Sequence, residues 1–366
     1  MSGVVADDER FMAAAIRLCR RNLGLTSSNP SVACLIVKDG VILGSAVTAP
    51  GGRPHAETQA LAEAGEAARG ATAYVTLEPC SHHGKTPPCA DALIASGVAR
   101  VVVSVTDPDE RVAGRGLSML RDAGISVETG VLEADGRAAL AAYLNRQTRK
   151  QPYVTLKLAV SADGMLGRLG AGQVAITGPV SRGQVHILRA ETDAILIGIG
   201  TALADDPELT CRLPGLEARS PVRIVLDPRL ELPPASKLAR TARVVPVIVV
   251  TSKESLDDPA LDGRHAALEA LGVEVLICDP RRLDALLPAL ATRGISSLLV
   301  EGGARAARSF LDAGLVDRIL LFNGAGSIGK DGVASPCVSG RMPDGFSLRH
   351  TARYGADVLH DYERDD

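Results

Sequence analysis

Three separated residues in the first part of the chain, His55, Cys80 and Cys89, predict a shared metal ion and therefore constrain the fold. One imidazole and two thiolates suit Zn²⁺, and three protein ligands leave the fourth position open to water, as in catalytic rather than structural zinc sites. Such a site requires that three distant segments meet at one point. Glu57 follows His55 by two residues, a poor helical spacing for a neighbouring ligand but a suitable place for a proton-transferring carboxylate.

The order of these residues matches the H-x-E and P-C pattern of zinc-dependent nucleobase deaminases. Pro79 precedes Cys80, as this pattern requires, but Cys89 follows Cys80 by nine residues instead of three. Taken alone, a His-x-Glu pair is usually solvated and a cysteine usually packs in a core. The joint occurrence of all the residues therefore indicates a catalytic zinc.

Secondary-structure patterns place these residues at the ends of elements. His55 precedes an Ala- and Leu-rich helix at 57–68, Cys80 follows a strand at 73–77, and Cys89 begins a helix at 89–96. This alternation favours a mainly parallel sheet layered with helices, with its ligands at strand ends. The other elements expected here are a helix at 8–23, a hairpin at 31–44 that turns at Asp39 and Gly40, strands at 101–105 and 126–131, and helices at 117–123 and 135–144.

A polar stretch at 145–152 ends in a proline and predicts a domain boundary, with one domain at 1–148 and another at 149–366. A chain of 366 residues is long enough for two full-sized cores. The second half predicts another α/β domain that does not repeat the first. Its expected strands are 153–160, 194–199, 222–226, 244–250, 273–277, 297–300 and 318–322, and its expected helices are 180–190, 283–292 and 304–313.

Two glycine-bearing turns in the second half, 198–201 and 301–304, follow predicted strands. Glycine at a strand-to-helix turn lets backbone N–H groups approach a phosphate, and the helix that follows favours its charge. A tight turn that needs a positive φ explains each glycine equally simply. A complete G-x-G-x-x-G is absent, so these turns alone do not decide for a nucleotide site.

Composition argues against several other classes of protein. A net charge of −3, an aromatic content of 2% and the lack of a basic stretch disfavour nucleic-acid binding. We expect no signal peptide, no membrane-spanning segment and, with seven cysteines, a reducing compartment, so the protein is predicted to be cytoplasmic. Cys19 and Cys34 are expected in the core, and Cys211, Cys278 and Cys337 are given no role.

The run 79–89 resembles the deaminase module of the bifunctional riboflavin-biosynthesis deaminase/reductase (RibD) family, as do 106–108, 112–116 and 123–125. The resemblance implies a cytidine-deaminase-like three-layer domain that hydrolyses the 2-amino group of a diaminopyrimidinone with a phosphoribosylamino arm. It implies Zn²⁺ on His55, Cys80 and Cys89, Glu57 as the proton shuttle, and substrate contacts from Asn29, His82 and Lys85. Thr48 and Asp109 depart from the family, which usually has histidine and asparagine there.

The second half resembles the family's reductase module at 156–159, 161–164, 188–190, 203–210, 223–227, 300–303 and 311–317. The resemblance implies a dihydrofolate-reductase-like α/β domain that uses NADPH to convert the ribosyl arm into a ribityl chain. Asp205 would orient or protonate the opened ribose, although an aspartate before Pro207 also suits a cap. Two departures are Gln173, in place of a common serine, and Ala175, in place of the usual tryptophan. The implied NADPH-lining residues are Ala159, Ala175, Thr201, Asp205 and the turn from Gly303 to Ser309. The implied substrate-facing residues are Gln173, Arg189, Leu209, Arg212 and Glu301.

Two alternative functions stay open at this point. One is a zinc deaminase with the same chemistry that acts on another nucleobase, as in a nucleic acid. The other is that the C-terminal module is not catalytic and serves in binding or assembly. Activity on a phosphoribosyl pyrimidine but not on tRNA or single-stranded DNA would separate the two substrates. NADPH oxidation that depends on the deaminated intermediate would show that the C-terminal module is a reductase. The expected partners are small phosphoribosyl pyrimidines, with no nucleic acid and no membrane, and a homo-oligomer is expected from the resemblance.

Overall fold

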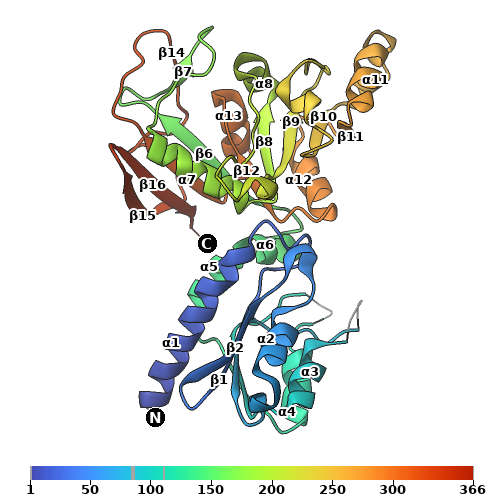
Figure 1. The fold of residues 1–366 in the computed structure, drawn as a ribbon. Coiled ribbons are helices and arrows are strands. Elements are labelled where there is room, and N and C mark those ends of the chain that lie inside the picture. Colours follow the sequence, from blue (N-terminus) through green and yellow to red (C-terminus); the bar gives the residue numbers. More distant parts are fainter. Residues whose placement is uncertain (1, 84–86, 110–111, 366) are drawn as a thin grey trace. The chain divides into compact units, whose positions relative to one another are not determined.

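The computed structural model describes residues 2–83, 87–109 and 112–365. The chain divides into two compact units, unit 1 (Met1–Lys150) and unit 2 (Gln151–Asp366), whereas the sequence placed the boundary after residue 148 (Figure 1). Each unit has its own sheet and its own hydrophobic core. Among the described residues, no helix has both the length and the apolar character needed to cross a bilayer.

Unit 1 is a five-stranded sheet covered by helices. Its elements are α1 (Ser2–Cys19), β1 (Ala33–Lys38), β2 (Val41–Val47), α2 (Ala56–Ala64), β3 (Thr72–Leu77), α3 (Cys89–Ser96), β4 (Arg100–Val105), α4 (Arg115–Asp122), β5 (Ser126–Thr129), α5 (Glu133–Ala139) and α6 (Ala141–Arg149). The strand order is β2-β1-β3-β4-β5. β1 is antiparallel to both β2 and β3, so the predicted parallel arrangement holds only for β3, β4 and β5.

Three layers make up unit 1, as the cytidine-deaminase-like fold requires. Alternate residues of a strand face opposite sides of the sheet. Cys34 and Ile36 of β1 therefore belong to the core on the side of the sheet that α2, α3 and α4 cover, while Leu35 belongs to the core beside α1. Cys19 lies on the buried face of α1, so the prediction that Cys19 and Cys34 belong to the core is confirmed.

Unit 2 contains a nine-stranded sheet in the order β11-β10-β9-β8-β12-β6-β13-β16-β15. Along this order, each strand from β11 through β6 to β13 is parallel to its neighbours. At the β13 edge, β16 pairs antiparallel with β13, and β15 pairs antiparallel with β16. The elements of unit 2 are β6 (Tyr153–Val160), β7 (Met165–Arg168), α7 (Pro179–Ala190), β8 (Ala194–Gly198), α8 (Ile199–Asp205), β9 (Val222–Leu226), α9 (Lys237–Arg240), β10 (Val247–Thr251), α10 (Lys253–Leu256), α11 (Asp262–Ala270), β11 (Glu274–Ile277), α12 (Leu283–Thr292), β12 (Ser297–Val300), α13 (Ala304–Asp312), β13 (Arg318–Asn323), β14 (Gly332–Ala334), β15 (Phe346–Tyr354) and β16 (Asp357–Arg364).

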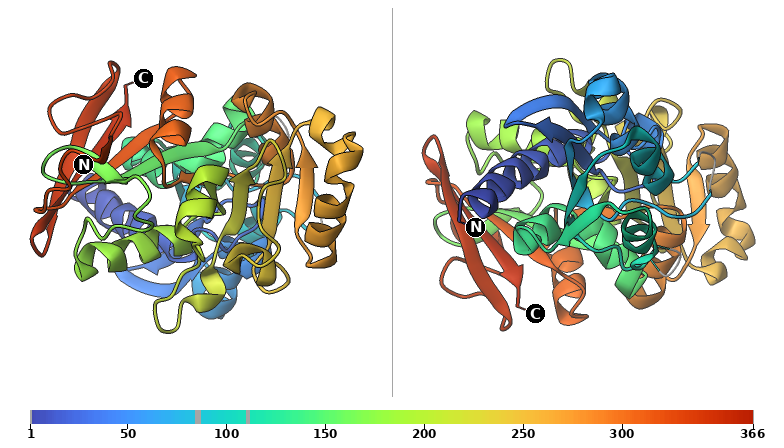
Figure 2. Two further views of the ribbon diagram at one scale, coloured as in Figure 1. Left: turned by 90° about the horizontal axis from the view of Figure 1, so that it is seen from above. Right: turned by 90° about the horizontal axis from the view of Figure 1, so that it is seen from below.

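Helices cover both faces of the unit 2 sheet (Figure 2). α12 and α13 pack on the face that carries Leu196 and Ile224, and α8, α9 and α11 pack on the face that carries Ile195 and Val225. Strands buried on both faces carry nearly continuous apolar runs, which explains why β8, β9 and β10 could be predicted.

Several elements differ from the sequence prediction. The helix expected at 135–144 is broken at Leu140 into α5 and α6, because Leu140 has a non-helical backbone (φ −103°, ψ 8°). Helices α8, α9, α10 and α11, the small β7–β14 sheet and the β15–β16 hairpin were not predicted from the sequence. β16 alternates buried and half-buried residues but is rich in charge, so its apolar period was weak.

Candidate functional site

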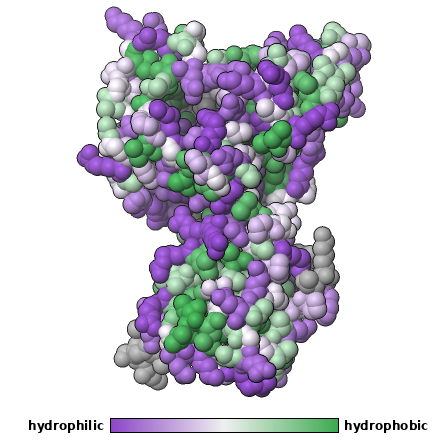
Figure 3. Space-filling view, in the orientation of Figure 1, coloured by the Kyte–Doolittle hydropathy of each residue, from purple (hydrophilic) through white to green (hydrophobic). Residues whose placement is uncertain are grey.

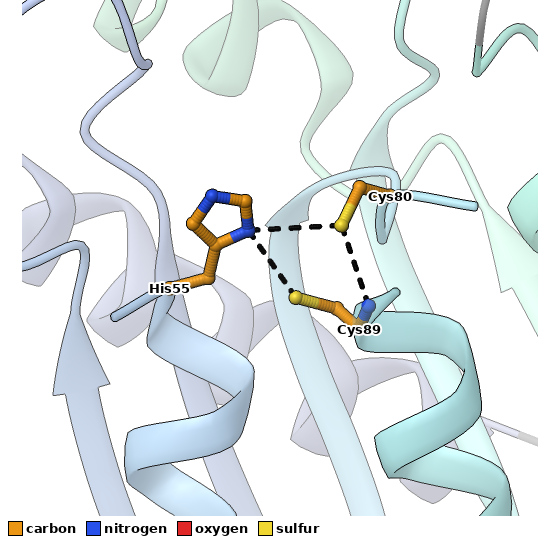
Figure 4. A group of neighbouring side chains, drawn as sticks. All are labelled: His55, Cys80 and Cys89. Carbon is orange, nitrogen blue, oxygen red and sulfur yellow. Dashed lines mark hydrogen bonds between the residues drawn. The ribbon is translucent and has the colours of Figure 1, made fainter. Parts of the chain in front are cut away.

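The side chains of the three predicted zinc ligands point toward one another (Figure 4). His55 is the N-cap residue of α2, Cys89 is the first residue of α3, and Cys80 follows β3. The Nδ1 atom of His55 lies 3.3 Å from Cys89 Sγ and 3.7 Å from Cys80 Sγ. Zn–S bonds of about 2.3 Å and Zn–N bonds of about 2.0 Å place tetrahedral ligand atoms roughly 3.5–3.8 Å apart. The spacing of the three side chains therefore fits zinc.

The two ligand thiols differ in their readiness to ionise: the pKa of Cys80 is lowered, whereas the hydrogen bond with Cys80, together with burial, raises the pKa of Cys89. Hydrogen bonds from Cys89 and from His55 lower the pKa of the Cys80 thiol to about 4, against the effect of burial. The Cys89 backbone N–H, at the start of α3, contributes by donating to Cys80 Sγ (3.3 Å). Zinc requires thiolates, and a cysteine near a helix N-terminus reaches that form readily.

Glu57 lies beside the ligands in the first turn of α2 and is only 3% exposed. Burial raises the pKa of its carboxyl, and the negative charge of Cys80 raises it further. Among the described residues, the group close enough to hold a metal is His55, Cys80 and Cys89, without Glu57. Glu57 is therefore placed to exchange protons next to the metal instead of binding it.

Three of the residues around this site have distinct surroundings. The Asn29 side chain packs on Gly52, where a Cβ atom would lie 2.2 Å from Asn29 Nδ2. Within the described part of the chain, His82 Nδ1 is buried and lacks a hydrogen-bond partner. Thr48 is buried, and its hydroxyl accepts a bond from the Val32 N–H (3.0 Å). Lys85 lies outside the described residues.

The two glycine-bearing turns of unit 2 lie side by side. Leu196 of β8 pairs with Val300 of β12, so the carboxyl ends of these parallel strands are neighbours. The Gly303 N–H donates to the Thr201 hydroxyl (3.1 Å), and a Cβ atom on Gly302 would lie 3.0 Å from the Thr201 side chain. The surface of unit 2 is hollowed between α13 and the β7–β14 sheet (Figure 3). Ligands of open α/β sheets bind at such strand ends.

Arg189 and Glu301 form a buried pair near these turns. Arg189 Nε and Nη2 donate to the two carboxylate oxygens of Glu301 (2.9 and 3.0 Å), and Nη1 donates to the Thr210 carbonyl (3.2 Å). Arg212, by contrast, is exposed and donates to Glu208 (3.1 Å). Leu209 is buried with a left-handed backbone (φ 56°), an uncommon conformation that is found at binding sites.

The remaining predicted residues of unit 2 have varied positions. Ala159 lies half-buried on β6, Gln173 and Ala175 are exposed in the segment before α7, and Asp205 ends α8. Burial raises the pKa of the Asp205 carboxyl. The neighbouring Asp206, not Asp205, accepts a bond from the Lys237 N–H (2.8 Å).

Lys157 lies in the segment 156–159 that resembles the reductase module, and no role was predicted for it from the sequence. Burial lowers the pKa of its ammonium group, while Glu301 raises it. The half-buried positions of β6 alternate with buried ones, so Lys157 shares a face with Ala159. This two-residue period is the signal that would have placed Lys157 with the predicted cofactor contacts.

Comparison with known proteins finds a matching family model for each of the two units. The profile described as "RibD C-terminal domain" matches residues 152–360, and the one described as "Cytidine and deoxycytidylate deaminase zinc-binding region" matches residues 5–105. The riboflavin biosynthesis protein RibD of Aquifex aeolicus is 44% identical over 315 residues, covering 86% of each chain. The chain belongs to the RibD family.

Two other relatives cover nearly the whole chain. RibD of Escherichia coli is 40% identical over 369 residues, covering 96% of this chain and 98% of its own. A crystal structure from Thermotoga maritima has a TM-score of 0.86 and 34% identity, and covers 98% of this chain and 99% of its own. That protein is described as a diaminohydroxyphosphoribosylaminopyrimidine deaminase/5-amino-6-(5-phosphoribosylamino)uracil reductase. The RibD family thus accounts for both units, which weakens the alternative of a non-catalytic C-terminal module.

A buried carboxylate follows β4 in the deaminase unit of this RibD family member. Asp107 accepts bonds from the Tyr143 hydroxyl (3.0 and 3.2 Å) and from the Asp109 N–H (2.9 Å). Burial raises the pKa of Asp107 to about 6, although these bonds oppose the shift. The folded protein therefore binds a proton here more tightly than the unfolded chain, whose carboxyl has the ordinary pKa of 3.8.

Replacing Asp107 by Asn should remove the free-energy cost of ionising this buried carboxyl, and the resulting gain in stability should depend on pH. Because the folded pKa is raised, ionising Asp107 removes stability as the pH rises from about 4 to about 6. The D107N variant should gain up to about 3 kcal/mol in unfolding free energy relative to the parent chain over this interval, with a plateau above it. Urea unfolding at several pH values measures the difference, with the exposed Asp122→Asn as the control. A difference in unfolding free energy between D107N and the parent chain that does not change with pH would contradict the prediction.

Proposed function

We propose that the chain catalyses two consecutive steps of riboflavin biosynthesis. Unit 1 would deaminate 2,5-diamino-6-(5-phosphoribosylamino)pyrimidin-4-one, and unit 2 would then reduce the ribosyl arm to give 5-amino-6-(5-phosphoribitylamino)uracil. The observation that carries this proposal is the convergence of His55, Cys80 and Cys89 beside Glu57, in a chain whose second unit matches the RibD C-terminal domain.

In unit 1, we assign zinc to His55, Cys80 and Cys89. When bound, Zn²⁺ lowers the pKa of a coordinated water and supplies hydroxide near neutral pH. Glu57 takes one proton from the attacking water and delivers it to the pyrimidine ring nitrogen, and it then moves a second proton, from the hydroxyl so formed, to the amino group that departs as ammonia. His82 is a substrate contact in this proposal, because its buried Nδ1 needs a polar partner that the described residues do not offer.

Asn29 and Lys85 complete the proposed substrate contacts of unit 1. The Asn29 amide packs against Gly52, which precedes the zinc ligand His55 by three residues. Lys85 is assigned to the substrate phosphate from the family resemblance.

In unit 2, NADPH supplies the hydride when it is bound. The residues that we assign to it are Ala159, Ala175, Thr201, Asp205 and Gly303. The hydrogen bond from the Gly303 N–H to the Thr201 hydroxyl supports this assignment, because it brings two of these residues together at the ends of adjacent parallel strands. Asp205 would hold a proton for the opened ribose, and its raised pKa suits that role.

The proposed substrate contacts of unit 2 are Gln173, Arg189, Leu209, Arg212 and Glu301. Arg212 is exposed and suits the 5′-phosphate. Glu301 holds Arg189 by two hydrogen bonds and attracts the ammonium group of Lys157, so these three charges form one fixed wall of the site. We add Lys157 to the groups that face the ribosyl arm.

We also propose that the substrates are small phosphoribosyl pyrimidines and that the protein is a cytoplasmic homo-oligomer. Seven free cysteines are consistent with a reducing compartment, and the net charge of −3 offers no general attraction to nucleic acid. Sedimentation of the purified protein tests the oligomeric state.

Purified protein incubated with the diaminopyrimidinone phosphate should release ammonia without NADPH and form the ribityl product only with NADPH. A zinc chelator should stop ammonia release. The same chelator should leave NADPH oxidation intact when the deaminated intermediate is supplied, because no zinc ligand lies in unit 2 among the described residues. Ammonia release that survives complete removal of zinc would refute the deaminase assignment, and NADPH oxidation without the intermediate would refute the reductase assignment.

A further inference from the structure

Glu78 is a buried carboxylate whose hydrogen bonds join the zinc-ligand segment to two other segments. It precedes Pro79 and Cys80 at the end of β3 and is 3% exposed. Its Oε2 atom accepts bonds from the N–H groups of Asp107 (3.3 Å) and Gly114 (3.0 Å), and its Oε1 atom accepts one from Gly116 (3.1 Å). These bonds come from both the end of β4 and the start of α4.

The first turn of α4 also touches the ligand segment directly. A Cβ atom on Gly116 would lie 2.1 Å from the Pro79 carbonyl oxygen, so only glycine allows this approach. Gly114 is the N-cap residue of α4, and a carboxylate at a helix N-terminus is favoured by the helix dipole. The backbone N–H of Glu78 donates to the Val105 carbonyl (2.9 Å), which fixes the ends of β3 and β4 relative to each other.

We infer that Glu78 is a positioning residue of the deaminase site, an inference that rests on the proposed function. It holds the segment 107–109 and the start of α4 at a fixed distance from Cys80. β3 and β4 are parallel neighbours, and their carboxyl ends border the position at which open α/β sheets bind ligands. The segment 107–109 thus forms a wall of the pyrimidine site, and Glu78 sets how far this wall stands from the zinc.

The geometry gives Glu78 more than a capping role. A cap needs bonds to the helix start alone, whereas the same Oε2 atom also accepts the bond from Asp107, which precedes Gly114 by seven residues. A displacement of about 1 Å in a positioned site can cost about 10²-fold in rate. Loss of the link should therefore weaken substrate binding even when the zinc stays bound.

Two substitutions, Glu78→Asp and Glu78→Gln, test this role. Aspartate keeps both oxygens but is one methylene shorter, so it cannot reach all three N–H groups. Glutamine keeps the length but turns an NH₂ group toward backbone donors. We expect the deaminase KM to rise about 10- to 100-fold in each variant, with a smaller change in kcat and about one zinc per chain. The rate of NADPH oxidation with the deaminated intermediate should not change, and Glu66→Gln, at an exposed site of unit 1, is the matched control.

A lower melting temperature with unchanged KM and kcat in both variants would overturn the inference, because it would leave Glu78 with a role in stability alone. Should Glu78→Gln fail to fold, the KM of the milder Glu78→Asp variant decides in the same way. If the proposed function is wrong, the outcome is different, because the unaltered chain then releases no ammonia from the diaminopyrimidinone phosphate.

Discussion

Replacing Glu57 by Gln should lower the deaminase kcat by about 10³-fold while the protein keeps its zinc. Positioned general acid–base groups contribute roughly 10²- to 10⁴-fold, and Glu57 is the buried carboxylate beside the three ligands. Glutamine preserves the shape of the side chain but cannot accept and return a proton. Ammonia release under saturating substrate measures kcat, and metal analysis of the same sample measures zinc.

The melting temperature of E57Q distinguishes a loss of catalysis from a loss of folding. Burial raises the pKa of the Glu57 carboxyl, so a neutral side chain is tolerated there, and the melting temperature of E57Q should equal or exceed that of the parent chain. NADPH oxidation with supplied intermediate should stay normal. Glu66→Gln, exposed just after the same helix, should change neither rate. An E57Q variant that retains zinc and releases ammonia at the parent rate would remove Glu57 from the mechanism.

The zinc site could be predicted from the sequence because each of its ligands lies at the end of an element. His55 precedes the apolar period of α2, Cys80 follows the β-rich run of β3, and Cys89 starts α3, and the structure has all three in those places. Ligands at such ends gather at one edge of a sheet whatever the details of packing. The direction of β1 was less predictable, since a buried strand has the same apolar pattern in parallel and antiparallel pairs.

Side-chain contacts between distant segments could not be predicted from the sequence, because they depend on how neighbouring strands are aligned. Arg189 and Glu301 were both predicted to face the substrate, but their pairing joins residues 112 positions apart on α7 and after β12. Similarly, Glu78 has no partner within its own element, and its three N–H donors become visible only once the ends of β3 and β4 are aligned. Such links between segments carry no periodic signal in the chain.

Replacing Glu301 by Gln should destabilise unit 2 by about 3 kcal/mol and abolish most of the reductase activity. Glu301 is 7% exposed and neutralises two cationic side chains, Arg189 by a bidentate contact and Lys157 through space. Removing the carboxylate leaves buried positive charge without compensation, which costs far more than the loss of an exposed ion pair. Urea unfolding measures the change, and NADPH oxidation with supplied intermediate measures the reductase.

Two further variants distinguish the loss of stability expected for E301Q from the effect of removing any carboxylate of unit 2. Glu274→Gln breaks an exposed pair with Arg293 in the same unit and should cost at most about 1 kcal/mol. Combining Arg189→Met with Glu301→Gln removes one unpaired charge, so it should recover part of the stability but none of the activity. Ammonia release by unit 1 should be normal in all three. Equal losses of stability in E274Q and E301Q would contradict the assigned role of the buried pair.

The stabilisation by Glu301 should also disappear in acid. Burial alone would raise the pKa of this carboxyl, but Arg189 and Lys157 lower it from the ordinary value of 4.5 to about 2. Because the folded pKa is depressed, the contribution is complete above about pH 4.5 and is lost as the pH falls from there through 2. The difference in unfolding free energy between the parent chain and E301Q should therefore be constant from pH 7 to 5 and narrow below 4.5. A difference that stays constant down to pH 3 would show that Glu301 stabilises unit 2 by packing and not by charge.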